Sequence, residues 1–279
     1  MTLNELRKWG KQQTNDADIL LMHFAKVDKT VLLTKGDLTV AQDVAEVFKN
    51  AVKLRIENMP LQYVLGVWEF MGLEFEVSPD VLIPREDTEV LVRLVLENEP
   101  SGAKGLEIGV GSGCISVSLA VFGGMDMVGV DVCHKALVVA ERNARQHCNG
   151  RPTVTAPMFV LSDLFENVYK EDKFDFIVSN PPYISGEDMQ ILDKSVKDYE
   201  PHKALHGGDD GLDFYRKIAI GAKDYLKPNG RIYFEIGYNQ AQDVKNILQN
   251  VGFFDINILK DTAGHDRVVY AQMEGDINV

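Results

Sequence analysis

The first 72 residues carry hydrophobic side chains at intervals of three and four positions. This spacing puts apolar side chains on one face of an α-helix, and it predicts amphipathic helices that share a small core. Pro60 stands just beyond the last of these positions, where a helix commonly ends. We therefore expect residues 1–72 to form a helical domain. The positions that define the pattern are Leu3, Leu6, Trp9, Ile19, Leu20, His23, Phe24, Val44, Val47, Phe48, Val52 and Ile56.

The pattern changes to a two-residue alternation between about residues 62 and 84. Alternation of this kind is typical of β-strands that bury one face. Pro79 and Pro84 end the stretch. We expect a short hairpin that turns near residues 69–72, with residues 73–84 as the connector between two domains.

From residue 85 to residue 279, strand-like apolar runs alternate with helical segments. Such alternation predicts an α/β domain with a doubly wound, mostly parallel sheet. The predicted strands are 104–109, 126–131, 157–161, 174–179 and 229–236, with a final pair near 253–259 and 267–273. The predicted helices are 87–97, 113–122, 134–147, 211–226 and 239–250.

Charge narrows the choice of partner. The chain of 279 residues has 29 basic and 42 acidic residues, for a net charge of −13. An acidic protein repels a phosphate backbone unless it keeps a local basic patch. A protein or small-molecule substrate is therefore favoured over nucleic acid.

The sequence contains no run of 18 or more apolar residues, which excludes a transmembrane helix. The polar N-terminal segment lacks the apolar core of a signal peptide, so we expect a cytoplasmic protein. Three cysteines and six histidines show no metal-ligand spacing, and we expect no metal site.

A glycine-rich loop follows the first predicted strand of the α/β domain. It consists of Gly109, Val110, Gly111, Ser112 and Gly113. Glycines allow a tight turn and a close approach of the backbone to a ligand, although this pattern alone is weak. Its GxGxG spacing differs from the GxGxxG spacing of dinucleotide-binding enzymes.

Acidic residues sharpen the interpretation of this loop. Glu107 precedes the first glycine, where it would oppose a pyrophosphate and suit a ligand with an ammonium and a sulfonium. Asp131 ends the next strand, where a carboxylate can accept both ribose hydroxyls or can cap the following helix. Asp163 and Leu164 follow the third strand, where they could meet an adenine amine and ring. Together these residues predict an S-adenosylmethionine pocket.

The fourth strand runs directly into Asn180, Pro181, Pro182 and Tyr183. Two prolines fix the backbone and present carbonyl groups without competing N–H groups. The Asn180 side-chain oxygen and the Pro181 carbonyl can then accept both hydrogens of one planar NH2 group, on which Tyr183 can stack. The alternative is a rigid turn without chemistry.

This arrangement can make a poorly nucleophilic nitrogen reactive. The lone pair of an amide or ring-conjugated amine is delocalised, so the nitrogen is a poor nucleophile. Holding both N–H bonds favours the geometry in which this lone pair can attack a methyl group in line. The acceptors also stabilise positive charge that develops on nitrogen, and the proton can leave afterwards. These four residues are therefore the predicted reaction centre.

Several longer runs resemble the release factor glutamine N5-methyltransferases over nearly the whole chain. Departures are small, since Val110 stands where threonine is more usual and Glu107 where aspartate is more common. The matching runs are residues 16–21, 63–66, 81–89, 109–113, 179–183, 199–212, 234–240 and 261–267.

The resemblance implies a helical bundle, a hairpin and a Rossmann-like, seven-stranded methyltransferase domain. It also implies the substrate, namely the glutamine of the Gly-Gly-Gln motif in class 1 peptide chain release factors. The cofactor would contact residues 109–113, Asp131, Asp163, Leu164 and Asn180, and the glutamine would lie on residues 180–183. The segment 84–89 would close over the site. A free monomer is expected, without a stable nucleic-acid partner.

Two other functions fit parts of the sequence. Enzymes that methylate the exocyclic amine of adenine in DNA share the Asn-Pro-Pro-Tyr motif, but they need base flipping and a basic cleft. A non-catalytic cofactor-binding protein would not need an intact reaction centre. We expect the helical domain to recognise the protein substrate, because a single glutamine offers too little surface for specificity.

Overall fold

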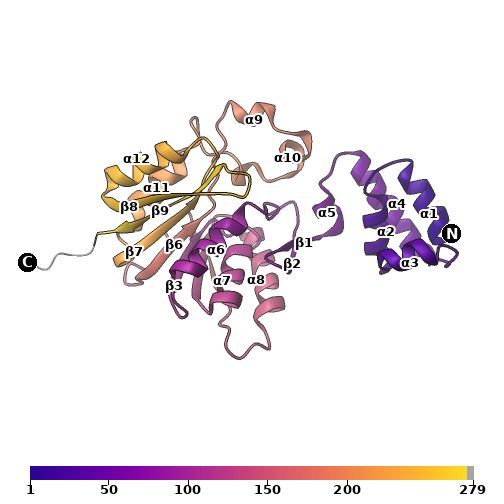
Figure 1. Cartoon of the computed structure of the whole chain (residues 1–279), viewed down its shortest axis with the longest axis horizontal. Coiled ribbons are helices and arrows are strands. Elements are labelled where there is room, and N and C mark those ends of the chain that lie inside the picture. Colours follow the sequence, from indigo (N-terminus) through magenta and orange to yellow (C-terminus); the bar gives the residue numbers. More distant parts are fainter. Residues whose placement is uncertain (275–279) are drawn as a thin grey trace, which may run out of the picture. The chain divides into compact units, whose positions relative to one another are not determined.

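The computed structural model describes residues 1–274, which form two compact units (Figure 1). The helical unit comprises Met1–Val67 and Asp193–Tyr199, and the sheet unit comprises Trp68–Leu192 and the chain from Glu200 onward. Among the helices of residues 1–274, none is long and apolar enough to cross a membrane. Within the same range, no cluster of three or more His, Cys, Asp or Glu side chains could hold a metal ion.

The helical unit is built on the apolar stripes that the sequence predicts. Leu3, Leu20 and Phe48 are fully or almost fully buried in its core. The first helix starts with a capping box, in which the Thr2 hydroxyl accepts the Glu5 N–H and the Glu5 carboxylate accepts the Thr2 N–H. The helices of this unit are α1 (Leu3–Lys11), α2 (Ala17–Ala25), α3 (Lys29–Thr34), α4 (Gln42–Ile56), α5 (Leu61–Leu65) and α10 (Lys194–Tyr199).

The expected hairpin is present, with strands β1 (Val67–Phe70) and β2 (Leu73–Glu76). Met71 and Gly72 form its turn in left-handed conformations. The alternation just before it is not a strand. Leu61–Leu65 is helical, because Leu61, Val64 and Leu65 pack against the core of the helical unit at helical spacing.

Seven strands form one sheet in the order β5-β4-β3-β6-β7-β9-β8, which confirms the expected α/β fold. The pairs from β5 to β7 are parallel, and β9 is antiparallel to both β7 and β8. The strands are β3 (Lys104–Ile108), β4 (Asp126–Asp131), β5 (Met158–Leu161), β6 (Phe174–Ser179), β7 (Leu226–Glu235), β8 (Phe253–Lys260) and β9 (Asp266–Met273).

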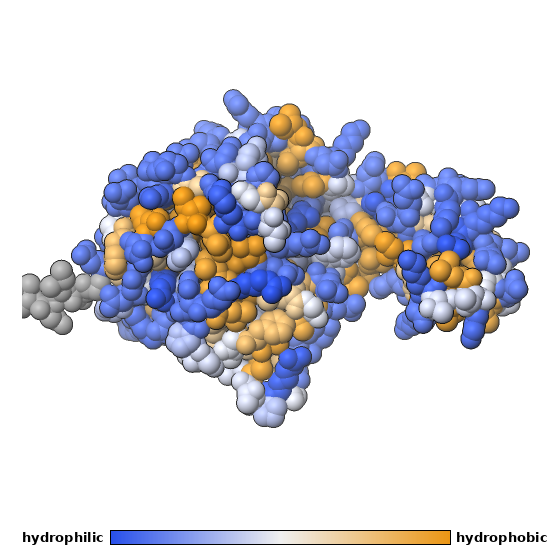
Figure 2. All heavy atoms as spheres, in the orientation of Figure 1, coloured by the Kyte–Doolittle hydropathy of each residue, from blue (hydrophilic) through white to orange (hydrophobic). Residues whose placement is uncertain are grey.

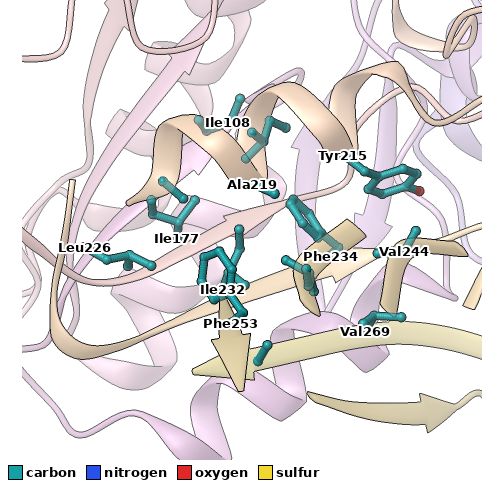
Figure 3. Packing of buried hydrophobic residues seen from close by; sticks show 14 of the residues in the cluster. Ile108, Ile177, Tyr215, Ala219, Leu226, Ile232, Phe234, Val244, Phe253 and Val269 are labelled. Carbon is teal, nitrogen blue, oxygen red and sulfur yellow. The ribbon is translucent and has the colours of Figure 1, made fainter. Parts of the chain in front are cut away.

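Helices cover both faces of this sheet and create two hydrophobic cores (Figure 1). Figure 3 shows one core, where Tyr215 and Ala219 pack over Ile232 and Phe234 of β7. Hydrophilic residues cover most of the face seen in Figure 2, interspersed with smaller hydrophobic patches. One face carries α6 (Thr88–Asn98), α7 (Cys114–Gly123) and α8 (His134–Cys148), and the other carries α11 (Asp213–Ala222) and α12 (Ala241–Val251).

The long connection between β6 and α11 contains short elements that the sequence patterns do not predict. These are α9 (Asp188–Ile191), α10 and the 3-10 helix η1 (His202–Ala204). Each is too short to show a helical period. The β-hairpin is likewise more than a linker, since Phe70 and Phe75 are buried against the same core as α8.

Gly105 tests the packing of the central strand. A β-carbon at this position would overlap the ring of Phe176 and approach the Met127 sulfur within 2.7 Å. We expect Gly105→Ala to lower the free energy of unfolding by about 1–3 kcal/mol, measured by urea titration. Gly186→Ala is the matched control, because its nearest neighbour would lie at 3.8 Å. Equal midpoints for both variants would contradict this account of the core.

Candidate functional site

A cavity of about 890 Å³ opens at the carboxyl ends of β3, β4 and β6. Both predicted motifs contribute to its wall, which is the usual place for a ligand in a parallel sheet. Gly113 and Tyr183 do not line the cavity. The predicted site residues that do line it are Gly109, Val110, Gly111, Ser112, Asp131, Asp163, Leu164, Asn180, Pro181 and Pro182.

The glycines of the loop have distinct structural roles. Gly109, Gly111 and Gly113 all have positive φ angles, which residues with a β-carbon rarely adopt. A β-carbon on Gly111 would meet no atom within 4 Å, so its backbone borders open space in the cavity. At Gly113 the β-carbon would lie 3.0 Å from that of Ala140, so this glycine lets α7 approach α8.

Asp131 is fixed by backbone N–H groups on both of its oxygens. Oδ2 accepts the Gly111 N–H at 2.9 Å, and Oδ1 accepts the Cys133 N–H at 2.8 Å. Neither donor belongs to α8, so the carboxylate does not cap that helix. Burial raises its pKa, and the backbone hydrogen bonds oppose this rise. Each oxygen keeps a further lone pair that can accept a hydroxyl of a ligand.

Glu107 is fully buried at the end of β3 and lines the same cavity. Its Oε2 accepts the Ser116 N–H at 3.0 Å and also the Ser116 hydroxyl, whereas Oε1 has no hydrogen-bond partner. Burial raises the pKa of Glu107 to about 8, and the bonds from Ser116 offset only part of this effect. An unpartnered carboxyl oxygen beside a cavity favours a ligand that carries a positive charge.

The Asn-Pro-Pro-Tyr motif is held beside the glycine loop by a hydrogen bond between strands. The Ser179 hydroxyl donates to the Ile108 carbonyl at 2.6 Å, joining the ends of β6 and β3. A β-carbon built on Gly109 would lie 4.0 Å from the Asn180 carbonyl oxygen. The two predicted motifs therefore meet at one edge of the sheet.

The Asn180 side chain is already hydrogen-bonded. Its Nδ2 donates to the Thr88 hydroxyl oxygen at 3.2 Å, and Thr88 is 3% exposed. The amide oxygen of Asn180 is not used in this bond and can accept from a ligand. The sequence patterns did not single out Thr88, because the two residues lie on segments far apart in the chain.

Tyr183 lies behind the cavity wall, where a second side chain holds its backbone. Gln240 donates through Nε2 to the Tyr183 carbonyl at 3.0 Å and accepts the Gly237 N–H through Oε1 at 3.0 Å. Burial raises the pKa of Tyr183 to about 12, so its hydroxyl stays protonated at neutral pH. A β-carbon on Gly207 would lie 2.6 Å from the Pro182 carbonyl oxygen, so this glycine allows the two loops to touch.

The segment expected to close over the site is anchored at two points. Arg85 forms an ion pair with Glu200, whose side chain is buried. Asp87 forms an ion pair with Arg267 at 3.0 Å, and Arg267 also contacts Asp261 at 3.1 Å. Pro84, Arg85 and Thr88 line the cavity, so this segment forms part of its wall.

Comparison with known proteins matches both units of the chain. The model of the methyltransferase small domain matches residues 86–200, and that of the PrmC N-terminal domain matches residues 5–66. A release factor glutamine methyltransferase from Geobacter sulfurreducens is 42% identical over 255 residues, which cover 91% of this chain and 87% of the relative. This chain belongs to the release factor glutamine methyltransferase family. A relative of the same name from Clostridium acetobutylicum is 40% identical over 93% of this chain and 91% of its own length.

A solved structure supports the fold of this family member. The crystal structure of a methyltransferase from Pyrococcus furiosus covers 74% of this chain and 91% of its own, with a TM-score of 0.55 and 20% identity. At this identity the likeness shows the fold alone, and it agrees with the seven-stranded sheet.

The cavity of this family member offers hydrogen-bond acceptors and an apolar surface that fit S-adenosylmethionine. Asp131 offers acceptors for a pair of hydroxyls, and the unpartnered Glu107 oxygen offers one for a cation. Gly111 leaves room for a ligand against the backbone. Leu164 supplies an apolar surface within the same cavity.

The buried Glu107 should make stability depend on pH. Its folded pKa of about 8 lies above the ordinary glutamate value of 4.5, so the folded state holds a proton that the unfolded state releases between these values. The free energy of unfolding therefore falls as pH rises from about 5 to 8. The Glu107→Gln variant lacks this pH-dependent loss. From pH 5 to pH 8 its free energy of unfolding should therefore rise by roughly 2–4 kcal/mol relative to that of the parent.

Chemical unfolding of the cofactor-free protein at pH 5, 6, 7 and 8 measures this difference. Glu97→Gln, which alters an exposed glutamate on α6, is the control. Parallel pH curves for the parent and Glu107→Gln would contradict the assignment.

Proposed function

We propose that this chain transfers a methyl group from S-adenosylmethionine to the side-chain amide nitrogen of the glutamine in the Gly-Gly-Gln motif of class 1 peptide chain release factors. The observation that most directly supports this reaction is that Asn180 lies beside the glycine loop, at the edge of one cavity. Family membership supports the choice of substrate, since the relatives are named release factor glutamine methyltransferases.

The proposed cofactor contacts follow from the chemistry of the cavity wall. Asp131 accepts the ribose hydroxyls, and residues 109–112 lie close to the cofactor, while Gly113 packs behind them against α8. Asp163 and Leu164 border the adenine, and the unpartnered oxygen of Glu107 accepts a hydrogen bond from the cofactor ammonium. Bound S-adenosylmethionine supplies an electrophilic methyl group on its sulfonium.

The proposed role of the Asn-Pro-Pro-Tyr motif is to hold the glutamine amide. The Asn180 oxygen and the Pro181 carbonyl accept the two amide hydrogens, while Pro182 keeps the backbone rigid. This restrains the amide nitrogen in line with its target and stabilises its developing positive charge. Tyr183 is proposed to support the motif from behind the cavity wall, where Gln240 holds its backbone. Because burial raises the pKa of Tyr183 to about 12, its phenol stays protonated at neutral pH and does not act as a base.

We propose that residues 1–72 recognise the substrate, that residues 73–84 connect the two domains and that residues 85–279 carry out methyl transfer. The helical unit has its own buried core and exposes apolar side chains such as Leu33 and Val47. A separately folded unit with exposed apolar residues can provide the surface that one glutamine lacks. We place the reaction in the cytoplasm, with the monomer as the active form.

The Asn180→Ala variant tests the reaction centre. It removes one acceptor for the amide, so methylation of a Gly-Gly-Gln release factor should fall at least about 100-fold. Cofactor affinity should change far less, because the glycine loop and Asp131 are intact. Transfer of labelled methyl groups and calorimetric cofactor titration measure the two effects. Asn246→Ala, an exposed position on α12, is the matched control.

Substrate identity is tested in the same assay. A release factor with Gln→Ala in its Gly-Gly-Gln motif and a DNA duplex are offered beside the intact factor. Label in the intact factor alone is expected, whereas label in DNA would overturn the proposed substrate. Unchanged turnover of Asn180→Ala would overturn the proposed role of this side chain.

Deletion of residues 1–66 tests the helical unit. Turnover of a whole release factor should fall at least tenfold more than turnover of a short Gly-Gly-Gln peptide, because only the whole factor can use the lost surface (about 1.4 kcal/mol of binding). Retained peptide turnover shows that the sheet unit is folded. Equal losses on both substrates would contradict the proposal.

A further inference from the structure

We propose that Gln240 is a positioning residue for methyl transfer, and that the NH2 group of its side chain holds the Asn-Pro-Pro-Tyr motif in its reactive shape. The inference rests on the proposed function, and it assigns to the reaction a residue that lies outside the cavity wall. Its basis is a set of hydrogen bonds from one buried amide to three separate segments of the chain.

The side-chain amide of Gln240 is bonded at both of its ends. Gln240 directly precedes α12 and is 9% exposed. Its Nε2 donates to the Tyr183 carbonyl at 3.0 Å and to the Gly211 carbonyl at 3.3 Å. Its Oε1 accepts the Gly237 N–H at 3.0 Å and the Tyr215 hydroxyl at 3.4 Å. Both hydrogens of the NH2 group are thus used within the protein.

The backbone around this amide allows only one orientation. Tyr183 and Gly211 present carbonyl oxygens to it, whereas Gly237 presents an N–H group. A reversed amide would place its oxygen against two carbonyls and its NH2 group against an N–H, and all of these groups would lose their bonds. The donor end of Gln240 therefore faces the Asn-Pro-Pro-Tyr motif.

Two glycines let the backbone come close enough for these bonds. A β-carbon on Gly211 would lie 2.8 Å from Nε2 of Gln240, and one on Gly237 would lie 2.9 Å from Oε1. Both distances are shorter than an ordinary van der Waals contact, so a side chain at either position would displace the amide. Backbone thus encloses the amide from two sides and fixes its place.

The motif is held at both ends as a result. Before it, the Ser179 hydroxyl is bonded to β3, and at its last residue Gln240 holds the Tyr183 carbonyl. The rings of the two prolines between these points fix their φ angles. The spacing between the two proposed acceptors, the Asn180 side-chain oxygen and the Pro181 carbonyl, is therefore set. Release of the Tyr183 end lets this spacing vary and slows the chemical step.

Gln240→Glu tests the inference, because it keeps the shape and the acceptor oxygens of the side chain and removes the donor. The carboxylate would face the Tyr183 and Gly211 carbonyls without a hydrogen to offer. We expect kcat on a release factor at pH 8 to fall at least about tenfold, with the cofactor Kd changed less than about twofold. Gln249→Glu, the same change at an exposed position of α12, is the matched control and should keep the parent kcat.

The pH profile separates the lost donor from general structural damage. Two facing carbonyls favour the neutral form of the carboxyl group in Gln240→Glu, and protonation gives it one O–H donor. The kcat of this variant relative to the parent should therefore rise about threefold or more from pH 8 to pH 6. The charged groups that act on Tyr183 occur in both proteins, so the ratio removes their own titration. These groups are Arg85, Asp87, Glu235 and Arg267.

Two results would overturn the inference, namely a Gln240→Glu enzyme with the parent kcat at pH 8 and a loss of equal size at both pH values. Unfolding midpoints at both pH values establish that the variants are folded. If Gln240→Glu does not fold, Gln240→Met keeps the length of the side chain without a donor and should show the tenfold loss at both pH values. The parent kcat in Gln240→Met would then count against the inference.

The wild-type reaction distinguishes the two levels of failure. If the wild type does not methylate the intact release factor, the proposed function fails. If it does and the Gln240 variants retain its kcat with the same substrate, the positioning inference fails alone.

Discussion

The site depends on one constraint, the joining of β3 and β6 as neighbouring parallel strands. Parallel strands bring their carboxyl ends to the same edge, so the glycine loop and the Asn-Pro-Pro-Tyr motif leave the sheet together. The Ser179–Ile108 hydrogen bond fixes the register at the point where they leave. A shift of one residue in this pairing would move Asn180 away from Gly109 and turn alternate side chains to the other face.

Buried carboxyl groups are the main departure from an ordinary core. Glu107 is the last residue but one of β3, and Glu235 is the last residue of β7. Both are almost completely buried and keep one oxygen without a hydrogen-bond partner. Burial of such groups costs free energy, and the pKa of each is raised accordingly, to about 8 and about 7. Glu107 lines the cavity beside the glycine loop, where its unpartnered oxygen is an acceptor for a ligand. Destabilised groups of this kind commonly mark functional sites.

Much of this arrangement can be predicted from local sequence patterns. All seven strands of the large sheet follow from short apolar runs, and the hairpin turn follows from the residues around Gly72. Asp131 and Asn180 can be predicted because Asp131 ends one strand and Asn180 directly follows another, and the topology of a parallel sheet then brings them to the same edge. The alternation before the hairpin misled the prediction, because Leu61 and Leu65 fit either period over so short a segment.

Thr88 and Gln240 cannot be identified as site residues from local sequence patterns. Thr88 contacts Asn180 across 92 positions of sequence, and Gln240 contacts Tyr183 across 57. Their roles depend on single hydrogen bonds between elements, which neither hydrophobic period nor spacing records. The short helices after β6 were missed for a related reason, since four to six residues cannot display a repeat.

The strand order has a consequence for the synthesis of the protein. Glu235 ends β7, and Arg267, which anchors Asp87, lies on the last strand β9. Because β9 pairs with β7, the ion pair that anchors Asp87 beside the cavity forms only when β9 has joined the sheet. A nascent chain that has exposed both sequence motifs outside the ribosome still lacks this anchor, so the wall of the cavity is completed only after β8 and β9 have been synthesised and paired.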